Sequence, residues 1–192
     1  MITVVSGLPR SGTSLMMQML LEGGMPVLRD AWRPADEHNP RGYLEYQKVR
    51  SLKDDRSWLH DADGRAIKVV SQLLYYLPDD FEYRVIFMRR DLDEVLQSQE
   101  KMLAGLNRAA GPDRNLMKLH FTRHLQELEK WLSLQSNIRL LDCSYHELIR
   151  TPSVAARSVS EFLNVGLDPA LVDPALMVRA VDPTLCRQRS GR

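Results

Sequence analysis

Residues 2–14 read ITVVSGLPRSGTS, and this stretch decides the fold. Residues 2–6 form a short run rich in β-branched side chains, the pattern of a strand buried on both faces. Gly7 and Gly12 interrupt the run, and residues 13–22 are rich in Leu and Met and stop at a pair of glycines. A buried strand that turns through glycines into a helix predicts the first unit of a parallel α/β sheet.

The rest of the chain continues this alternation. The sequence predicts strands over residues 26–28, 66–70, 84–88 and 138–141, and helices over residues 72–77, 92–103, 115–135 and 152–164. Residues 29–43 are rich in Pro, Asp, Asn and Arg, residues 104–114 hold Gly, Asn, Pro and Asp, and both stretches are expected to be loops. Strands that alternate with helices imply right-handed crossovers. We therefore expect an α/β fold of three layers, a parallel sheet flanked by helices on both faces.

Length and composition fit one domain over residues 1–192, with a mass of 22.1 kDa. The formal net charge of +1 gives no overall field that would attract nucleic acid or a membrane surface. Two cysteines, Cys143 and Cys186, are too few for a disulfide framework. No apolar run reaches the ~18 residues of a membrane span, and the start of the chain lacks the pattern of a leader. These features predict a cytoplasmic protein.

The turn after the first strand has the spacing of a phosphate-binding loop. Gly7 and Gly12 are five residues apart, as in GxxxxGK[ST], so backbone N–H groups can surround an anion at the start of a helix. Thr13 stands where that motif has its Lys, and Arg10 supplies a charge instead. The alternative is a plain glycine-rich turn. Without the Lys, the loop suits a phosphate or sulfate better than nucleoside triphosphate chemistry. The residues expected to bind are Pro9, Arg10, Ser11, Gly12, Thr13 and Ser14.

Four segments together resemble the sulfotransferases that use 3′-phosphoadenosine 5′-phosphosulfate (PAPS), in their bacterial P-loop branch. PRSGTS at residues 9–14 resembles the family's 5′-phosphosulfate loop, and RAIK at residues 65–68 resembles the strand with a catalytic Lys. VIFMRR at residues 85–90, with Ser98, resembles the 3′-phosphate segment, and SYHEL at residues 144–148 resembles a further family element. The resemblance covers about residues 2 to 165. It implies a P-loop NTPase-like sulfotransferase fold, PAPS as donor and adenosine 3′,5′-bisphosphate as product.

The resemblance also implies roles at the nucleotide. Arg90 and Ser98 match the positions that hold the 3′-phosphate, and Tyr145 matches one that stacks on adenine. Each has a simpler interpretation. Arg90 is near Asp91, Asp93 and Glu94, so a local ion pair is possible; Ser98 is compatible with an exposed helix position, and Tyr145 with a core side chain.

Sulfuryl transfer builds negative charge on the bridging oxygen of the leaving phosphate, so the site needs cations and N–H donors directed at that oxygen. Arg10, Lys68 and the loop amides of residues 11–14 are the candidates. Lys68 interrupts an apolar strand, and its alternative is a strand-end side chain that reaches solvent. No metal is expected, because the five histidines form no ligand set: His120 and His124 share a helix face without a third partner.

Two family features are missing from this chain. Val70 stands where the small-molecule branch has a His that acts as base, and no Gly-rich, Trp-containing segment follows near the C-terminus. Arg187 and Arg189 are candidates to replace that segment, with a frayed basic tail as the alternative. Other branches use a Glu base between the phosphate-loop helix and the Lys-bearing strand.

That region carries Glu37, His38 and Glu45. Glu45 is the leading candidate for the base, because Tyr43 and Leu44 are placed to anchor the chain beside it. The alternative for Glu45 is a capping residue in the first turn of the next helix.

Two other functions stay open. A P-loop kinase would use Asp142, at the end of the last strand, to hold Mg²⁺, and the missing loop Lys argues against it. A nucleotide-binding module without catalysis is the third reading. For a sulfotransferase, the acceptor is a hydroxyl or amine on a small molecule, a glycan or a peptide, and the sequence does not decide the oligomeric state.

Overall fold

The computed structural model describes residues 1–36, 39–105, 112–165 and 172–182. Within these residues, four parallel strands form one sheet in the order β2-β1-β3-β4. The strands are β1 (Ile2–Gly7), β2 (Ala66–Val70), β3 (Tyr83–Arg89) and β4 (Ile138–Ser144). The carboxyl ends of the four strands therefore meet at one edge of the sheet. This edge is where ligands bind in open parallel sheets.

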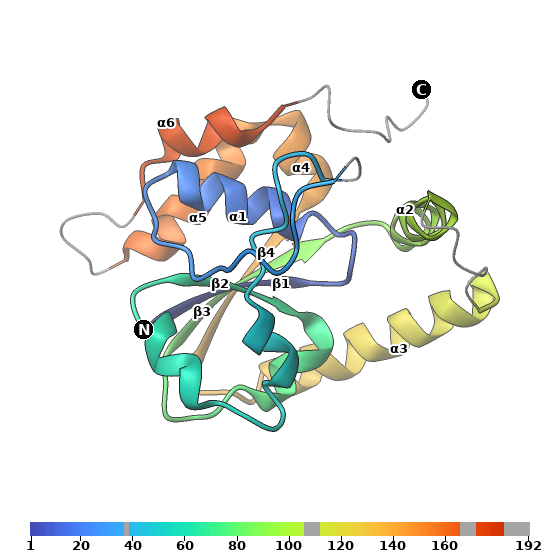
Figure 1. Ribbon diagram of the computed structural model, residues 1–192, viewed down its shortest axis with the longest axis horizontal. Helices are drawn as coiled ribbons and strands as arrows, with labels where there is room; N and C mark the ends of the chain where they lie inside the picture. Colours follow the sequence, from blue (N-terminus) through green and yellow to red (C-terminus); the bar gives the residue numbers. More distant parts are fainter. Residues whose placement is uncertain (37–38, 106–111, 166–171, 183–192) are drawn as a thin grey trace.

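Helices cover both faces of the sheet (Figure 1). One face packs against α1 (Thr13–Glu22), α4 (Tyr145–Arg150), α5 (Pro152–Asn164), α6 (Pro174–Met177) and the 3₁₀ helix η4 (Val178–Ala180). The other packs against α3 (Arg114–Leu132) and the 3₁₀ helices η1 (Gln47–Ser51), η2 (Ser57–Ala62) and η3 (Ser71–Tyr76). The helix α2 (Leu92–Gly105) follows β3 and contacts α3. This is the predicted three-layer α/β architecture.

The two cores follow from the alternation of side chains along the strands. Val5, Ile86 and Met88 join the core beneath α1 and α5, whereas Val4, Val85 and Phe87 join the core above α3. Both sets are fully or almost fully buried, because helices cover both faces. The same period of two sets the orientation of β2: Ile67 and Val69 enter the α3 core, so Lys68 lies on the α1 side.

Two short elements differ from expectation. Residues 26–28 form no strand: Val27 makes a single bridge to Ala66, and Pro26 has no N–H with which to extend the pairing. Residues 72–77 were predicted to be helical, and the structure forms a 3₁₀ helix over residues 71–76. Pro78 holds the preceding Leu77 in an extended conformation, so the segment ends before α-helical turns accumulate. None of the helices in the described ranges is long and apolar enough to cross a membrane.

Candidate functional site

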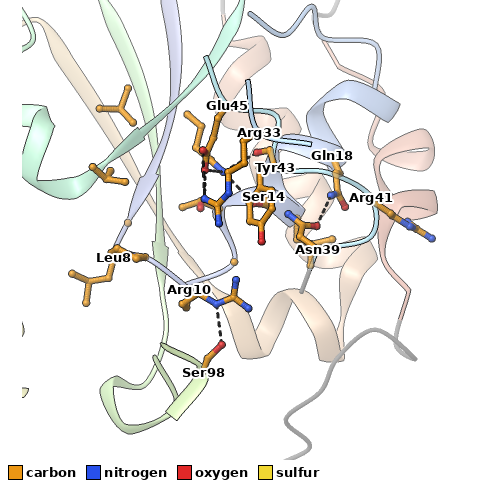
Figure 2. A pocket seen from close by; sticks show the side chains of 18 of the residues that line it. Leu8, Arg10, Ser14, Gln18, Arg33, Asn39, Arg41, Tyr43, Glu45 and Ser98 are labelled. Carbon is orange, nitrogen blue, oxygen red and sulfur yellow. Dashed lines mark hydrogen bonds and ion pairs between the residues drawn. The ribbon is translucent and has the colours of Figure 1, made fainter. Parts of the chain in front are cut away.

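A cleft of about 800 Å³ opens at the carboxyl edge of the sheet. Its floor is the loop between β1 and α1, and its walls come from residues 32–33 and 39–50, the end of β2, α2 and α4. Figure 2 shows the labelled side chains of the loop, of α1, of α2 and of the segment with Tyr43 and Glu45 around this cleft. The cleft therefore has two ends, one beside β2 and one beside β3 and α2.

The β1–α1 loop presents the first amides of α1 to this cleft. Gly12 is the N-cap of α1 and has no side chain with which to accept a hydrogen bond. The N–H groups of Thr13, Ser14 and Leu15 precede the first intrahelical bond, which Met16 donates to the Gly12 carbonyl. All three residues line the cleft. An anion at this position would accept from these donors and benefit from the helix dipole.

Close packing explains both loop glycines. Gly12 has φ 102°, and a Cβ there would lie 2.5 Å from Cδ2 of Tyr145. Gly7 has φ 148°, and a Cβ there would lie 2.8 Å from the carbonyl oxygen of Met88. Side chains at either position would displace the loop from β3 or from α4. The glycines thus fix the distance between the loop and its neighbours.

Ser11 differs from the rest of the loop. Its N–H donates to the Leu8 carbonyl (3.1 Å), which closes the turn, and its buried hydroxyl has no hydrogen-bond partner among the described residues. Ser11 does not line the main cleft. The N–H of Ser11 is therefore not available to an anion, and the predicted loop donors that remain are the amides that follow Ser11.

Arg10 is the cation of the loop, at the tip of the turn. Its backbone lies in the left-handed region (φ 71°), and its Nε donates to Ser98 Oγ at 3.0 Å. Burial lowers the pKa of Arg10 from its ordinary value, and the guanidinium remains charged at neutral pH. Ser98, which is predicted to bind a 3′-phosphate together with Arg90, thus contacts Arg10 and lines the same cleft as Arg90.

Lys68 is buried at the β2 end of the cleft, with 7% of its side chain exposed. Its ammonium donates to the carbonyl oxygen of Tyr43 (2.7 Å), to Glu45 Oε1 (2.8 Å) and to Ser14 Oγ (3.1 Å). Burial lowers the pKa of Lys68, and the charge of Glu45 opposes that shift. The alternative of a solvent-reaching lysine is wrong: three groups, from α1 and from the segment with Tyr43 and Glu45, hold this cation in place.

Glu45 joins two cations at the same end. Besides Lys68, its carboxylate pairs with Arg33 Nη1, at 3.2 Å from Oε1 and 3.5 Å from Oε2. Glu45 precedes η1 and is not in its first turn, so the capping alternative is wrong. As expected, Tyr43 and Leu44 are buried and anchor the chain beside it.

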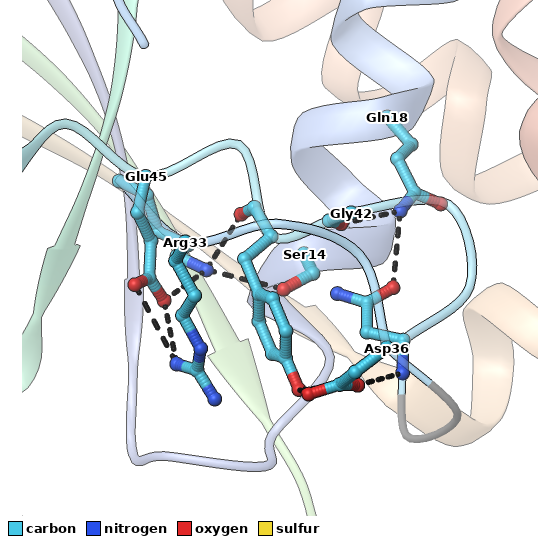
Figure 3. A network of polar contacts seen from close by, with 9 residues as sticks. Ser14, Gln18, Arg33, Asp36, Gly42 and Glu45 are labelled. Atoms are coloured by element: carbon cyan, nitrogen blue, oxygen red, sulfur yellow. Dashed lines mark hydrogen bonds and ion pairs between the residues drawn. The ribbon is translucent and has the colours of Figure 1, made fainter. Parts of the chain in front are cut away.

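Figure 3 shows how the segment before Glu45 is held. The hydroxyl of Tyr43 donates to Asp36 (2.9 Å), and the guanidinium of Arg33 lies 3.4 Å from the centroid of the Tyr43 ring. Burial raises the pKa of Tyr43, and the bond to Asp36 raises it further, so Tyr43 stays protonated and donates. Gln18 of α1 donates to the carbonyl of Gly42 at 3.0 Å. The segment is therefore fastened to α1.

The β3 end contains Arg90. Its Nε pairs with Glu94 (3.0 Å), its Nη1 donates to the carbonyl of Arg10 (3.0 Å), and its guanidinium lies 4.2 Å from the centroid of the Tyr145 ring. His146 also contacts Glu94, at 3.2 Å. Arg90 thus supports the phosphate loop and covers one face of Tyr145. One edge of that ring packs against Gly12.

Basic side chains dominate the cleft. Among the described lining residues, the cations outnumber the carboxylates of Glu45 and Asp182. The basic lining residues are Arg10, Arg33, Arg41, Arg50, Lys68, Arg90 and Lys101. Because the net charge of the chain is only +1, this local excess marks the cleft as a place for anions.

The structure brings together most of the predicted site. Pro9, Arg10, Gly12, Thr13, Ser14, Glu45, Lys68, Arg90, Ser98 and Tyr145 all line the one cleft. Glu37, His38, Arg187 and Arg189 lie outside the described residues. Sequence reasoning missed Arg33, because its contact with Glu45 depends on the path of an irregular loop that no local pattern encodes. In the described ranges, no cluster of three His, Cys, Asp or Glu side chains has the geometry of a metal site.

The chain resembles one sulfotransferase structure in its fold. It superposes on the sulfotransferase domain from the curacin biosynthetic pathway with a TM-score of 0.51, over 96% of this chain and 88% of that chain. The sequence identity is 14%, so the likeness shows the fold alone. No protein-family model matches the chain, and no curated protein matches it.

Proposed function

We propose that this protein transfers a sulfuryl group from PAPS to a hydroxyl or amine acceptor without a metal. One observation carries the proposal: buried Lys68 joins Ser14 of the phosphate loop to the carboxylate of Glu45 at one end of the cleft. A cation and a candidate base are thus held together beside the anion-binding amides. The fold shared with a sulfotransferase domain supports the same assignment.

The chemistry assigns a task to each group. The bond between sulfur and the bridging oxygen breaks, and a bond from sulfur to the acceptor oxygen forms. The electron pair of the broken bond stays on the phosphate of adenosine 3′,5′-bisphosphate, where Lys68, Arg10 and the loop amides stabilise the charge. The acceptor proton passes to the carboxylate of Glu45. The products are a sulfate ester, the bisphosphate and a protonated Glu45, which then releases its proton to water.

The β3 end of the cleft is proposed to hold the nucleotide. Arg90 is the cation for a 3′-phosphate, and binding requires that phosphate to share or replace the contact between Arg90 and Glu94. Adenine is proposed to pack beside Tyr145. Because Arg90 already covers one face of that ring, stacking would use the opposite face.

The kinase alternative gains no support from the geometry. Asp142, its candidate Mg²⁺ ligand, is on β4 and separated from β1 by β3. Its carboxylate pairs with Arg89 at 2.6 Å and does not line the cleft. Thr13 also leaves the loop without the Lys that phosphoryl transfer uses.

The proposal is tested by following the label from two donors. The protein is incubated with ³⁵S-PAPS or with γ-³²P-ATP and Mg²⁺, each with a mixture of simple alcohols, phenols and amines. We expect acid-stable ³⁵S products with wild-type protein, and a loss of at least about 10²-fold with Lys68→Met. Lys130→Met, at an exposed position of α3, is the matched control and should match wild type. Transfer of ³²P without ³⁵S would overturn the proposal in favour of a kinase.

A further inference from the structure

The β2 end of the cleft extends beyond Glu45 into a partly apolar recess. We call this recess the acceptor arm; its described lining residues are Trp32, Tyr46, Val49, Arg50, Val70 and Leu73. It lies at the end of the cleft away from Arg90 and Ser98, because Val70 ends β2 whereas Arg90 follows β3. Nothing in the proposed handling of the nucleotide uses these side chains.

The arm exposes apolar surface that a folded chain ordinarily covers. Trp32 is 42% exposed and Val70 is 39% exposed, and both face the cleft. Tyr46, Val49 and Leu73 continue this lining, and they are themselves packed on the core above α3. Exposed apolar side chains inside a concave site are the usual mark of a ligand with an apolar body.

The arm is also held in shape. One carboxylate oxygen of Asp30 accepts from the N–H of Trp32 (2.9 Å), and the other accepts from the N–H of Gln47 (2.7 Å). The N–H of Asp30 donates to the carbonyl of Glu45 at 3.1 Å. These bonds join the segment with Trp32 to the start of η1, which carries Val49 and Arg50. The recess is therefore built before any ligand enters.

Arg50 gives the arm a charge preference. Its guanidinium lies 4.8 Å from the centroid of the Trp32 ring, and no carboxylate of the described chain lies within ion-pair distance of it. The other cations near this end, Arg33 and Lys68, already share Glu45. Arg50 is thus the cation that remains available to a ligand, beside the flat face of an indole.

We propose that the acceptor arm binds the sulfate acceptor and selects an alcohol with an apolar body and an anionic group, such as a hydroxy fatty acid. This rests on the proposed sulfuryl transfer. The apolar body lies along Trp32 and Val70, the anion pairs with Arg50, and the hydroxyl reaches Glu45. A glycan would place its polar groups against the apolar side chains of Trp32 and Val70. A cationic acceptor would be repelled by Arg50.

The test uses four alcohols that differ in two properties: the body is apolar or polar, and the molecule is anionic or neutral. They are ω-hydroxydodecanoate, its methyl ester, glucuronate and methyl glucoside. Each Kd is measured by ligand-observed NMR on the protein saturated with adenosine 3′,5′-bisphosphate, and again without nucleotide. We expect ω-hydroxydodecanoate to bind at least about tenfold more tightly than the other three, as a charge-assisted contact added to apolar burial predicts.

Variants identify the two contacts. Arg50→Ala should bring the acid to the Kd of its methyl ester and leave the ester unchanged, whereas Trp32→Ala should weaken both. Lys48→Ala removes a neighbouring charge of η1 that does not line the cleft, and it should bind all four like wild type. All three side chains are exposed, so the variants should fold, and thermal unfolding checks this.

The outcomes separate the two proposals. Equal Kd values for acid and ester, tighter binding of either sugar, or binding of none of the four would overturn the inference about the arm. If the bisphosphate does not bind while the acid still binds through Arg50, the arm stands as an anion site and the sulfotransferase proposal fails.

Discussion

The two ends of the cleft hold their central cations in different ways. At the β2 end, Lys68 is fixed by three groups from two segments: Ser14 of α1, and the carbonyl of Tyr43 and the carboxylate of Glu45 from the segment before η1. At the β3 end, Arg90 lies between β3 and α2 and is held by Glu94 of α2 and by the carbonyl of Arg10. The partners of Lys68 belong to the proposed chemistry, whereas those of Arg90 shape the loop. Changes at the β2 end should therefore act on kcat, and changes at the β3 end on Kd.

The largest expected effect is at Glu45. Glu45→Gln removes the proposed base and keeps its shape, so kcat should fall about 10²–10⁴-fold, the usual range for a positioned acid–base group. The Kd for adenosine 3′,5′-bisphosphate should stay near that of wild type, because the change is at the other end of the cleft. Steady-state kinetics and calorimetry measure the two quantities.

A near-normal kcat for Glu45→Gln would remove Glu45 from this role and pass the test to Glu37. A large loss of bisphosphate affinity would instead show that the two ends are not independent. Either result would contradict the proposed division of roles between the β2 end and the β3 end of the cleft.

Lys68→Met should lower kcat about 10²–10³-fold, because the variant removes a preorganised cation from the leaving oxygen. The variant leaves Glu45 paired with Arg33, so the carboxylate keeps one partner. Single-turnover rates with saturating PAPS measure this effect without a contribution from product release. An unchanged rate, with raised KM alone, would make Lys68 a binding residue and not a stabiliser of the transition state.

Arg90→Ala tests the β3 end by comparing two ligands. Adenosine 3′,5′-bisphosphate should lose at least about tenfold in affinity, as expected for a charge-assisted contact of roughly 1.5–3 kcal/mol, while AMP, which lacks the 3′-phosphate, should lose less. Arg89→Ala is the matched control: Arg89 pairs with Asp142 and Glu129 and does not line the cleft. Equal losses for both ligands would mean that Arg90 acts only by supporting the loop.

The smallest expected effect is in the pH profile. Burial lowers the pKa of Lys68 below its ordinary value of 10.5, so the ammonium loses its proton as pH rises through that lowered value. Activity that needs the cation should therefore fall at a pH below 10.5. Glu45 opposes the shift, so Glu45→Gln should move this alkaline limb to lower pH in the residual activity. A limb that stays in place would show that another group controls it.

The parts of the site that follow from local sequence were predictable. A buried strand, two glycines and a helix start place the phosphate loop, and the period of two along β2 places Lys68 on the α1 side. Glu45 was predicted as the base because the family resemblance pointed to this region and Tyr43 and Leu44 were expected to anchor the chain; both are buried. The contact of Arg90 with Glu94 was visible as an i,i+4 pair.

The remaining contacts depend on the path of residues 29–36 and 39–46, which have irregular backbone. Arg33 meets Glu45 and Tyr43, and Trp32 meets Arg50, only after this segment folds back over the edge of the sheet. The periodicity of apolar residues along the sequence does not predict the path of such a segment. The bond between Arg10 and Ser98 joins residues 88 positions apart, so spacing did not reveal it, and the predicted role of Ser98 with Arg90 at a phosphate stays a prediction.

The most direct test of the central claim is the stabilisation of the protein by nucleotides. Thermal unfolding is measured with adenosine 3′,5′-bisphosphate, ADP and ATP, each with and without Mg²⁺. The account predicts that the bisphosphate raises the stability most, by about 2.7 kcal/mol at 100 times its Kd, and that Mg²⁺ makes no difference. Stabilisation by ATP with Mg²⁺ and not by the bisphosphate would contradict it in favour of a kinase, and stabilisation by none of them would indicate a module that binds no such nucleotide.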